Sequence, residues 1–214
     1  ADAFYRVALL NNKAGDTDAA KKYQKLAKLI ETNFRKFFWV KDHFTEYINP
    51  ARGAIFNHGL TDVDWSAIAT NMATDGQKNI LWPQLKEEKL FYYKGMPTGI
   101  ATRPERYEKW ETTYADNQDL AAMGRVWYIE SWARANMHDG KGLLETIRRV
   151  CKEGREGGYY WRERYNDKGG YGAQKYNEYP ANLVLIIQRF LLGVEHGLDG
   201  TLFIGHTAPE EFWR

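Results

Sequence analysis

Carboxylates set among aromatic rings are the residues of this chain whose types and spacing could do chemistry. The densest group lies in the stretch WRERYNDKGGYGAQKYNEY, which gathers these carboxylates and rings around a Gly-Gly pair: Glu163, Glu178, Trp161, Tyr165 and Tyr171. Glycoside hydrolysis uses two carboxyl groups, one that protonates the leaving oxygen and one that activates water or attacks directly. Flat aromatic faces suit the faces of sugar rings. The stretch therefore indicates a sugar-handling site.

Both carboxylates of this stretch also have ordinary structural explanations. Glu163 could form a salt bridge within its loop, to Arg162 or Arg164. Glu178 stands just before a predicted helix, where a carboxylate complements the helix dipole. We therefore take Glu163 as the first catalytic candidate of the stretch and Glu178 as its rival.

A second source of acid chemistry is the motif GLTDVDW, which places Asp62 and Asp64 close to Trp65. A carboxyl group held against an indole is less readily ionised, so its pKa rises toward the working pH of a general acid. The alternative for Asp62, or for Thr61 before it, is to cap the helix that follows. Asp62 and Asp64 are the candidates for the acid.

A long connection, YYKGMPTGIATRPERYEKWETTYADNQ at residues 92–118, is interrupted by Gly and Pro. Connections of this length in a compact domain are usually functional. We expect its substrate-binding residues to be Trp110 and Tyr114 for stacking, Asn117 and Gln118, and Arg103 for an acidic sugar. The carboxylates that flank the two amides, Asp116 and Asp119, could bind hydroxyl groups or cap the next helix. A solvated loop is the alternative for Arg103.

Composition excludes several classes of function. The net charge is +2 and no basic block occurs, so we expect neither nucleic acid nor an anionic membrane as a partner. The five histidines are far apart in sequence and no phosphate or dinucleotide motif is present, so we expect no metal and no cofactor. Cys151 is the only cysteine and is predicted to be a small buried hydrophobe.

Helices must position these residues, because apolar side chains recur at steps of three and four along most of the chain. The pattern predicts helices over residues 2–14, 17–38, 62–72, 76–90, 118–137, 141–153 and 180–196, with a short extended segment at TLFIG. Trp127 and Trp132 are expected in the core, since the helix that carries them is apolar on several sides. The sequence therefore predicts an all-α fold of helical hairpins with long aromatic loops at one end.

The order of these features resembles the six-hairpin glycosidases, whose fold is an (α/α)6 toroid. Four segments resemble successive parts of that fold: AFYRVALLNNKAGDTDAAKKYQKLAKLIETNFRKFFW, TTYADNQDLAAMGRVWYIESWARANMHDG, WRERYNDKGGYGAQKYNEYPA and GLDGTLFIGHTAPEEFW. The resemblance implies that residues 1–214 form a single domain, the C-terminal portion of a toroid whose remainder lies outside this chain. The chain also starts without Met in a helix-like pattern, so we expect its first residue not to be native, and its compartment is not predicted.

The resemblance also implies an activity. In this superfamily the general base is commonly the Glu of a late E-x-Y loop, which matches Glu163 and Tyr165. It implies a glycoside hydrolase acting on an oligosaccharide, polysaccharide or glycoside, with inversion as the expected outcome. Two alternatives stay open: a polysaccharide lyase or sugar epimerase on a similar toroid, and a non-catalytic helical domain that binds glycans or a protein.

Overall fold

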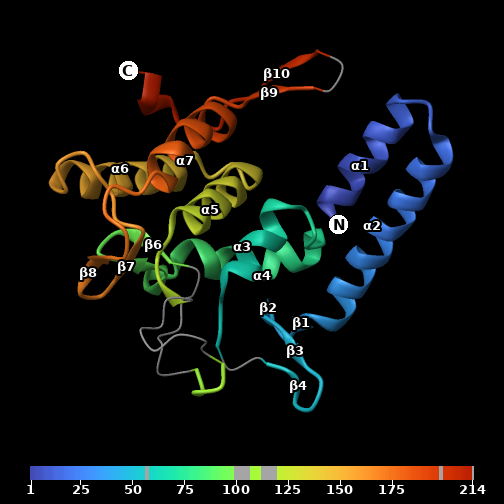
Figure 1. Cartoon of the computed structure of the whole chain (residues 1–214), viewed down its shortest axis with the longest axis horizontal. Helices are drawn as coiled ribbons and strands as arrows, with labels where there is room; N and C mark the ends of the chain where they lie inside the picture. The colour runs from blue at the N-terminus through green and yellow to red at the C-terminus, as the bar shows by residue number, and fades with distance from the viewer. Residues whose placement is uncertain (56–57, 99–106, 112–119, 198–199, 214) are drawn as a thin grey trace.

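Helices make up most of the computed structural model, which describes residues 1–55, 58–98, 107–111, 120–197 and 200–213 (Figure 1). The α-helices are α1 (Asp2–Lys13), α2 (Thr17–Phe37), α3 (Asp62–Ala69), α4 (Asp75–Glu87), α5 (Gly124–Asn136), α6 (Gly140–Glu156) and α7 (Glu178–Ile186). A π-helical stretch, η4 (Ile187–Leu191), continues α7, and short 3-10 turns occur at η1 (Lys89–Phe91) and η5 (Glu210–Trp213). In the described part of the chain, no helix combines the length and the apolar character needed to cross a membrane.

Local sequence sets where these helices begin. Gly15 takes a positive φ of 85° in the turn between α1 and α2, and the Asp16 carboxylate accepts a hydrogen bond from the Ala19 N–H at 2.9 Å. α3 begins with a capping box formed by Thr61 and Asp64. The predicted helices at 2–14 and 17–38 are thereby confirmed, with ends that shift by about a residue.

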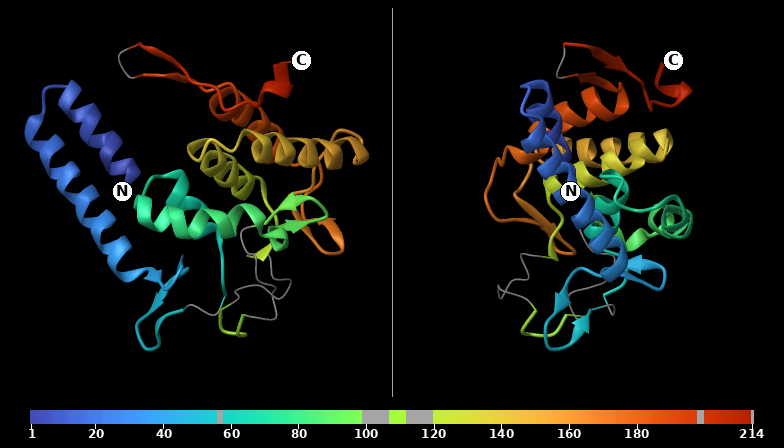
Figure 2. Two further views of the ribbon diagram at one scale, coloured as in Figure 1. Left: turned by 180° about the vertical axis from the view of Figure 1, so that it is seen from behind. Right: turned by 90° about the vertical axis from the view of Figure 1, so that its right-hand side faces the viewer.

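The α1–α2 hairpin stands at one side of the molecule (Figures 1 and 2). α1 packs along α2, with the rings of Phe4 and Tyr23 stacked 6.0 Å apart. At the far end of α2, the Arg35 Nε donates a hydrogen bond to the carbonyl of Met72 at 2.6 Å, which ties the hairpin to the turn after α3.

Short strands join the helices, and they pair as five two-stranded antiparallel sheets in the described residues. The pairs are β1 (Trp39–Val40) with β2 (His43–Phe44), β3 (Ile48–Asn49) with β4 (Gly53–Ala54), β5 (Tyr92–Tyr93) with β6 (Met96–Pro97), β7 (Arg164–Asn166) with β8 (Gly169–Tyr171), and β9 (Val194–His196) with β10 (Leu202–Ile204). The predicted extended segment at TLFIG is confirmed as β10. The expectation of an all-α fold, built as helical hairpins of an (α/α)6 toroid, is wrong.

The physical reason is turn chemistry inside segments that look irregular in the sequence. Lys94 and Gly95 join β5 to β6 with positive φ values of 49° and 84°, the backbone that a two-residue hairpin turn requires. Strands of two or three residues are too short to show an alternating pattern. Hairpins of this kind leave no periodic signal in the sequence.

Two predicted helix boundaries also move. The helix expected from residue 118 starts as α5 at Gly124, because Ala122 pairs as a strand with both Tyr165 and Thr98. The helix expected to run through residue 196 ends its regular part at Ile186, and residues 194–196 form β9 instead. Backbone pairing with distant segments overrides helix propensity at both places.

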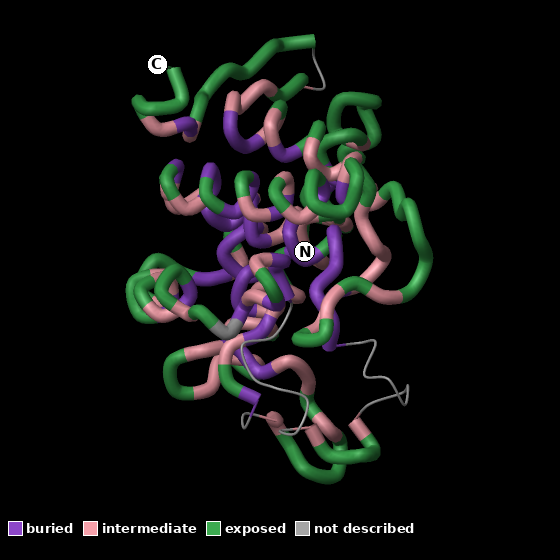
Figure 3. The backbone as a smooth tube through the Cα atoms, turned by 90° about the vertical axis from the view of Figure 1, so that its left-hand side faces the viewer, coloured by how far each residue is buried: buried purple, intermediate pink, exposed green. Residues whose placement is uncertain are grey.

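Two hydrophobic clusters meet at α5, which packs against α3, α6 and α7. One cluster contains Trp127, Leu143, Tyr165, Tyr179 and Ile186 among others, and the second contains Phe44, Trp65, Ile68, Leu81 and Ala133 among others. Trp132 packs against both, and Trp127 is fully buried, so the predicted core positions of these two residues are confirmed. Figure 3 shows the buried backbone gathered in the middle of the molecule.

Candidate active site

The helices α3, α5 and α7 begin close together, which brings their first residues to one place. A methyl group added to Gly124, the first residue of α5, would lie 2.7 Å from Cγ of Glu178, the first residue of α7. Arg125, next in α5, is near enough to Asp62, the first residue of α3, to lower the pKa of that carboxyl. The positive ends of three helix dipoles therefore lie around two carboxyl groups.

Asp62 is half-buried at this junction. Burial raises the pKa of its carboxyl to about 6, and the negative charge of Glu46 acts in the same direction. Arg125 and the backbone N–H groups of Asp62 and Val63 oppose the shift. A carboxyl group with a pKa of about 6 is partly protonated close to neutral pH, which is the state that a general acid needs.

Glu178 occupies a different environment at the same junction. It is half-buried in the first turn of α7, at the positive end of the helix dipole. Within the ranges that the structure describes, its side chain forms no hydrogen bond and no ion pair. The carboxylate is therefore not committed to another protein group and is available to a bound molecule.

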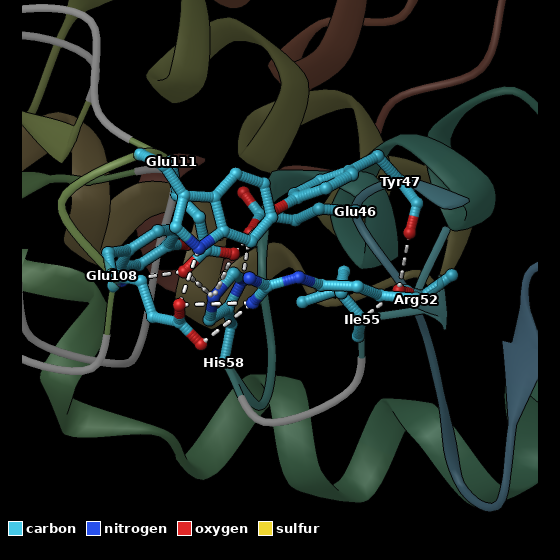
Figure 4. A network of polar contacts seen from close by, with 10 residues as sticks. Glu46, Tyr47, Arg52, Ile55, His58, Glu108 and Glu111 are labelled. Carbon is cyan, nitrogen blue, oxygen red and sulfur yellow. Dashed lines mark hydrogen bonds and ion pairs between the residues drawn. The ribbon is translucent and has the colours of Figure 1, made fainter. Parts of the chain in front are cut away.

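A polar network extends from the neighbourhood of Asp62 (Figure 4). Glu46, just before β3, uses its Oε2 atom to accept a hydrogen bond from the Tyr107 hydroxyl at 2.7 Å. The same oxygen lies 2.6 Å from Nδ1 of His58. The other ring nitrogen of His58, Nε2, lies 3.1 Å from Oε1 of Glu111. Carboxylates thus bracket the imidazole on both sides.

This arrangement raises the pKa of His58. Burial, which leaves the residue 2% exposed, lowers the pKa of the imidazole. The hydrogen bond and charge of Glu46 and the charge of Glu111 raise the pKa by more, so it ends above its ordinary value. The ring also stacks on Tyr107, with centroids 3.8 Å apart. His58 therefore joins two chain segments far apart in sequence, between carboxylates that favour the charged form of its ring.

The outer part of the network is exposed. The Tyr47 hydroxyl and the backbone N–H of Glu108 donate hydrogen bonds to Glu111. Arg52, in the loop between β3 and β4, forms an ion pair with Glu108 at 3.0 Å, and its guanidinium lies 4.6 Å from the ring centroid of Trp110. Trp110 is 45% exposed. This predicted stacking residue thus lies at the rim of the network, with Arg52 over its ring.

Glu163, the predicted base, is engaged within its own loop. Its Oε1 forms an ion pair with Arg164 at 2.7 Å, and its Oε2 accepts a hydrogen bond from the Ala173 N–H at 3.1 Å. The loop salt bridge that the sequence left open as an alternative is present. The catalytic role of Glu163 stays a prediction.

Asp64 holds the fold together at the start of α3. It is fully buried, and its carboxylate accepts hydrogen bonds from the backbone N–H groups of Phe44 at 2.7 Å and Thr61 at 2.9 Å. Burial raises the pKa of Asp64 to about 7, against the opposing effect of these two donors. Because both oxygens bind backbone inside the core, Asp64 is placed to tie β2 to α3 rather than to meet a substrate.

Two of the predicted aromatic residues, Trp161 and Tyr165, line the same cavity beside α6, whereas Tyr171 lies elsewhere. Tyr165 is buried, and its hydroxyl accepts a hydrogen bond from the Arg162 N–H at 2.9 Å. Tyr171 packs on the cluster of Ala121, Met123 and Val126 at the start of α5. Trp161 lies against α6, away from that cluster. The remaining predicted binding residues lie outside the described residues: Arg103, Tyr114, Asn117 and Gln118.

Sequence reasoning missed the network of Glu46, His58, Tyr107 and Glu111. Its members come from two irregular segments about fifty residues apart, so no motif spacing connects them. The usable signal is that His58 and Glu46 flank one loop broken by Pro and Gly, which brings them together. In the part of the chain that the structure describes, no group of His, Cys, Asp and Glu is arranged to hold a metal ion.

Comparison with known proteins gives a likeness in fold. No family model matches the sequence, and no curated protein matches it. A solved structure named Sialidase superposes with a TM-score of 0.75 over 96% of this chain, at 15% sequence identity. The chain spans 20% of the length of that structure. At this identity the likeness concerns the fold of the matched part.

Proposed function

We propose that this chain carries the acid/base site of a carbohydrate-processing enzyme, a glycoside hydrolase, with Asp62 as general acid and Glu178 as general base. The observation that supports the proposal is the meeting of α3, α5 and α7, which gathers two carboxyl groups in unlike environments. Pairs of titratable groups whose surroundings differ in this way are typical of acid/base sites. The name of the structural neighbour, Sialidase, denotes an enzyme of the same class.

In this proposal, each carboxyl group performs one half of the reaction. Asp62 gives its proton to the glycosidic oxygen as the bond to the sugar breaks. Glu178 takes a proton from the attacking water, and the start of α7 stabilises its charge. We expect inversion at the anomeric carbon, by analogy with the family that the sequence resembles. Glu163 is the alternative base, and it would first have to leave Arg164.

A lyase or an epimerase would need a Tyr or His base close to an Arg, with the tyrosine deprotonated or the imidazole neutral. Burial and the neighbouring carboxylates hold the pKa values of Tyr107 and Tyr47 well above their usual range, and both phenols donate hydrogen bonds to those carboxylates. Glu46 and Glu111 raise the pKa of His58 and so favour its protonated form, which cannot act as a base. These groups are poor bases, so the observations favour hydrolysis over proton abstraction from a sugar.

The test uses the purified protein with a panel of 4-nitrophenyl and 2,4-dinitrophenyl glycosides. Asp62→Asn should lower hydrolysis of the 4-nitrophenyl substrate by about 10²-fold or more, because it removes the acid, and spare the dinitrophenyl substrate, which needs no protonation. Glu178→Gln should slow both, and ¹H NMR of the first-formed anomer reports inversion. Asp75→Asn is the matched control, since Asp75 is the first residue of α4 but is fully exposed.

If Asp62→Asn lowers the hydrolysis of both substrates equally, Asp62 is not the general acid. If Glu163→Gln abolishes turnover and Glu178→Gln does not, the base is Glu163. A wild-type protein that hydrolyses no glycoside in the panel, yet binds glycans, would contradict the proposed enzyme.

A further inference from the structure

A cavity of about 290 Å³ lies between α6 and the segment that carries β7 and β8. Its lining is distinct from the candidate active site and includes Glu153, Tyr160, Trp161, Arg162, Gln174 and Lys175. The volume is close to the lower end of the range for small-molecule pockets, roughly 300 Å³. A single sugar unit is small enough for a cavity of this volume.

The Trp161 wall of this cavity is fixed before any ligand arrives. The indole Nε1 donates a hydrogen bond to the carbonyl of Val150 at 2.9 Å. The ring also lies directly on the backbone of α6, since a Cβ at Gly154 would come within 2.1 Å of it. A glycine at this position of the helix makes room for the ring. The cavity therefore presents an aromatic surface whose orientation is already set.

Two cations, Lys175 and Arg162, stand beside this wall. The Lys175 ammonium lies 4.6 Å from the centroid of the Tyr160 ring, a cation–π contact that directs it. Lys175 holds a left-handed backbone with φ of 53°, a conformation that costs a lysine energy. In the described residues, neither Lys175 nor Arg162 forms an ion pair with a carboxylate. Two unpaired cations in one pocket favour an anion.

Among the described residues that line this cavity, Glu153 is the one that carries a carboxyl group. Burial and then the charge of Glu156 raise its pKa, whereas Lys94 lowers it. Even with Glu153 fully ionised, the two cations leave the lining with a net positive charge. Gln174 adds an amide that can bind hydroxyl groups.

We propose that this cavity binds a small carboxylated saccharide, such as a uronic acid unit. One face of the sugar ring packs on Trp161, its carboxylate meets Arg162 and Lys175, and a hydroxyl group reaches Gln174. The aromatic wall distinguishes this ligand from a simple anion, and the two cations distinguish it from a neutral sugar. The inference does not rest on the proposed acid/base site, because the two share no residue.

Three probes separate these contributions in titrations followed by NMR: D-glucuronate carries both the ring and the charge, D-glucose the ring alone, and acetate the charge alone. Glucuronate should bind at least about tenfold more tightly than either of the others, since a hydrogen bond to a charged group contributes about that much. Lys175→Ala should remove most of that preference. Tyr159→Ala is the matched control, because Tyr159 is 76% exposed, adjacent to Tyr160, and not in the lining.

Binding of acetate as tight as glucuronate would overturn the saccharide, and equal binding of glucose would overturn the carboxylate. The same loss in Lys175→Ala and Tyr159→Ala would overturn the site. The NMR signal of the Trp161 indole N–H, measured in the wild-type protein, tests the site even if a variant fails to fold. It must shift with glucuronate, and a signal that stays in place refutes the proposal.

Discussion

Replacing His58 with glutamine should destabilise the protein by about 3 kcal/mol near pH 6. The change removes the cation between Glu46 and Glu111 and leaves two carboxylates facing a neutral amide. Breaking a buried ion pair by removing one partner costs about 3–5 kcal/mol. The lower end applies because Glu46 keeps its hydrogen bond from Tyr107 and Glu111 keeps one from Tyr47.

The effect should depend on pH with a definite sign. The pKa of His58 is raised in the folded protein above its unfolded value of about 6.5. The stabilisation from the charged ring is therefore fully present below about pH 6.5 and is lost as the pH rises through the folded-state pKa. The wild-type protein should lose stability over that interval. The His58→Gln variant has no proton to lose there, so the difference between the two proteins should shrink on the alkaline side.

Urea unfolding followed by tryptophan fluorescence at pH 6 and pH 9 measures both quantities, and an NMR titration of the imidazole gives its pKa. His196→Gln is the control, since His196 is exposed on β9 and outside the network. A loss below about 0.5 kcal/mol at pH 6, within the range of surface substitutions, would refute the reasoning. So would a loss of equal size at both pH values.

Three further changes follow from named contacts. Glu46→Gln should lower the pKa of Asp62 from its value of about 6, because the substitution removes the negative charge of Glu46 that raises this pKa. A ¹³C NMR titration of the Asp62 carboxyl carbon measures the shift, and an unchanged pKa contradicts the coupling. Gly154→Ala should cost about 1–3 kcal/mol in urea unfolding, since the new methyl group would collide with the Trp161 ring; a neutral result would mean that the ring moves freely. Gly76→Ala, in α4 with open space around it, should instead stabilise the protein by about 0.5–1 kcal/mol, and a destabilised variant would show that the space is not open.

Local chemistry predicted the helices and one extended segment, and not the pairing of strands into sheets. Gly15 and Asp16 mark the turn into α2 in the sequence as they do in the structure, because capping depends on neighbouring residues alone. The start of α5 at Gly124 depends on a pairing between Ala122 and Tyr165, more than forty residues away. Interactions of that kind leave no trace in a helical pattern, so the predicted helix began too early.

The residues of the candidate site also differ in whether neighbouring sequence alone could predict their contacts. Asp62 could be chosen from its motif, and the motif also contains Asp64, which the fold turns into the core. Whether a carboxyl group faces backbone donors or a ligand depends on the segments that pack around it. The bond of Glu163 to Arg164 was foreseeable because the two residues are adjacent, whereas the bonds of His58 to Glu46 and Glu111 connect separate loops.

The position of α5 between the two clusters has a consequence for how this protein can change over evolution. Asp62 belongs to a helix on one flank of α5 and Glu178 to a helix on the other. Substitutions at core residues such as Trp132, which touches both clusters, can therefore alter the spacing of the two carboxyl groups without contact with any substrate. Drift in the interior and drift in the loops would then act on separate properties: the first on the geometry of the reaction, the second on the choice of ligand.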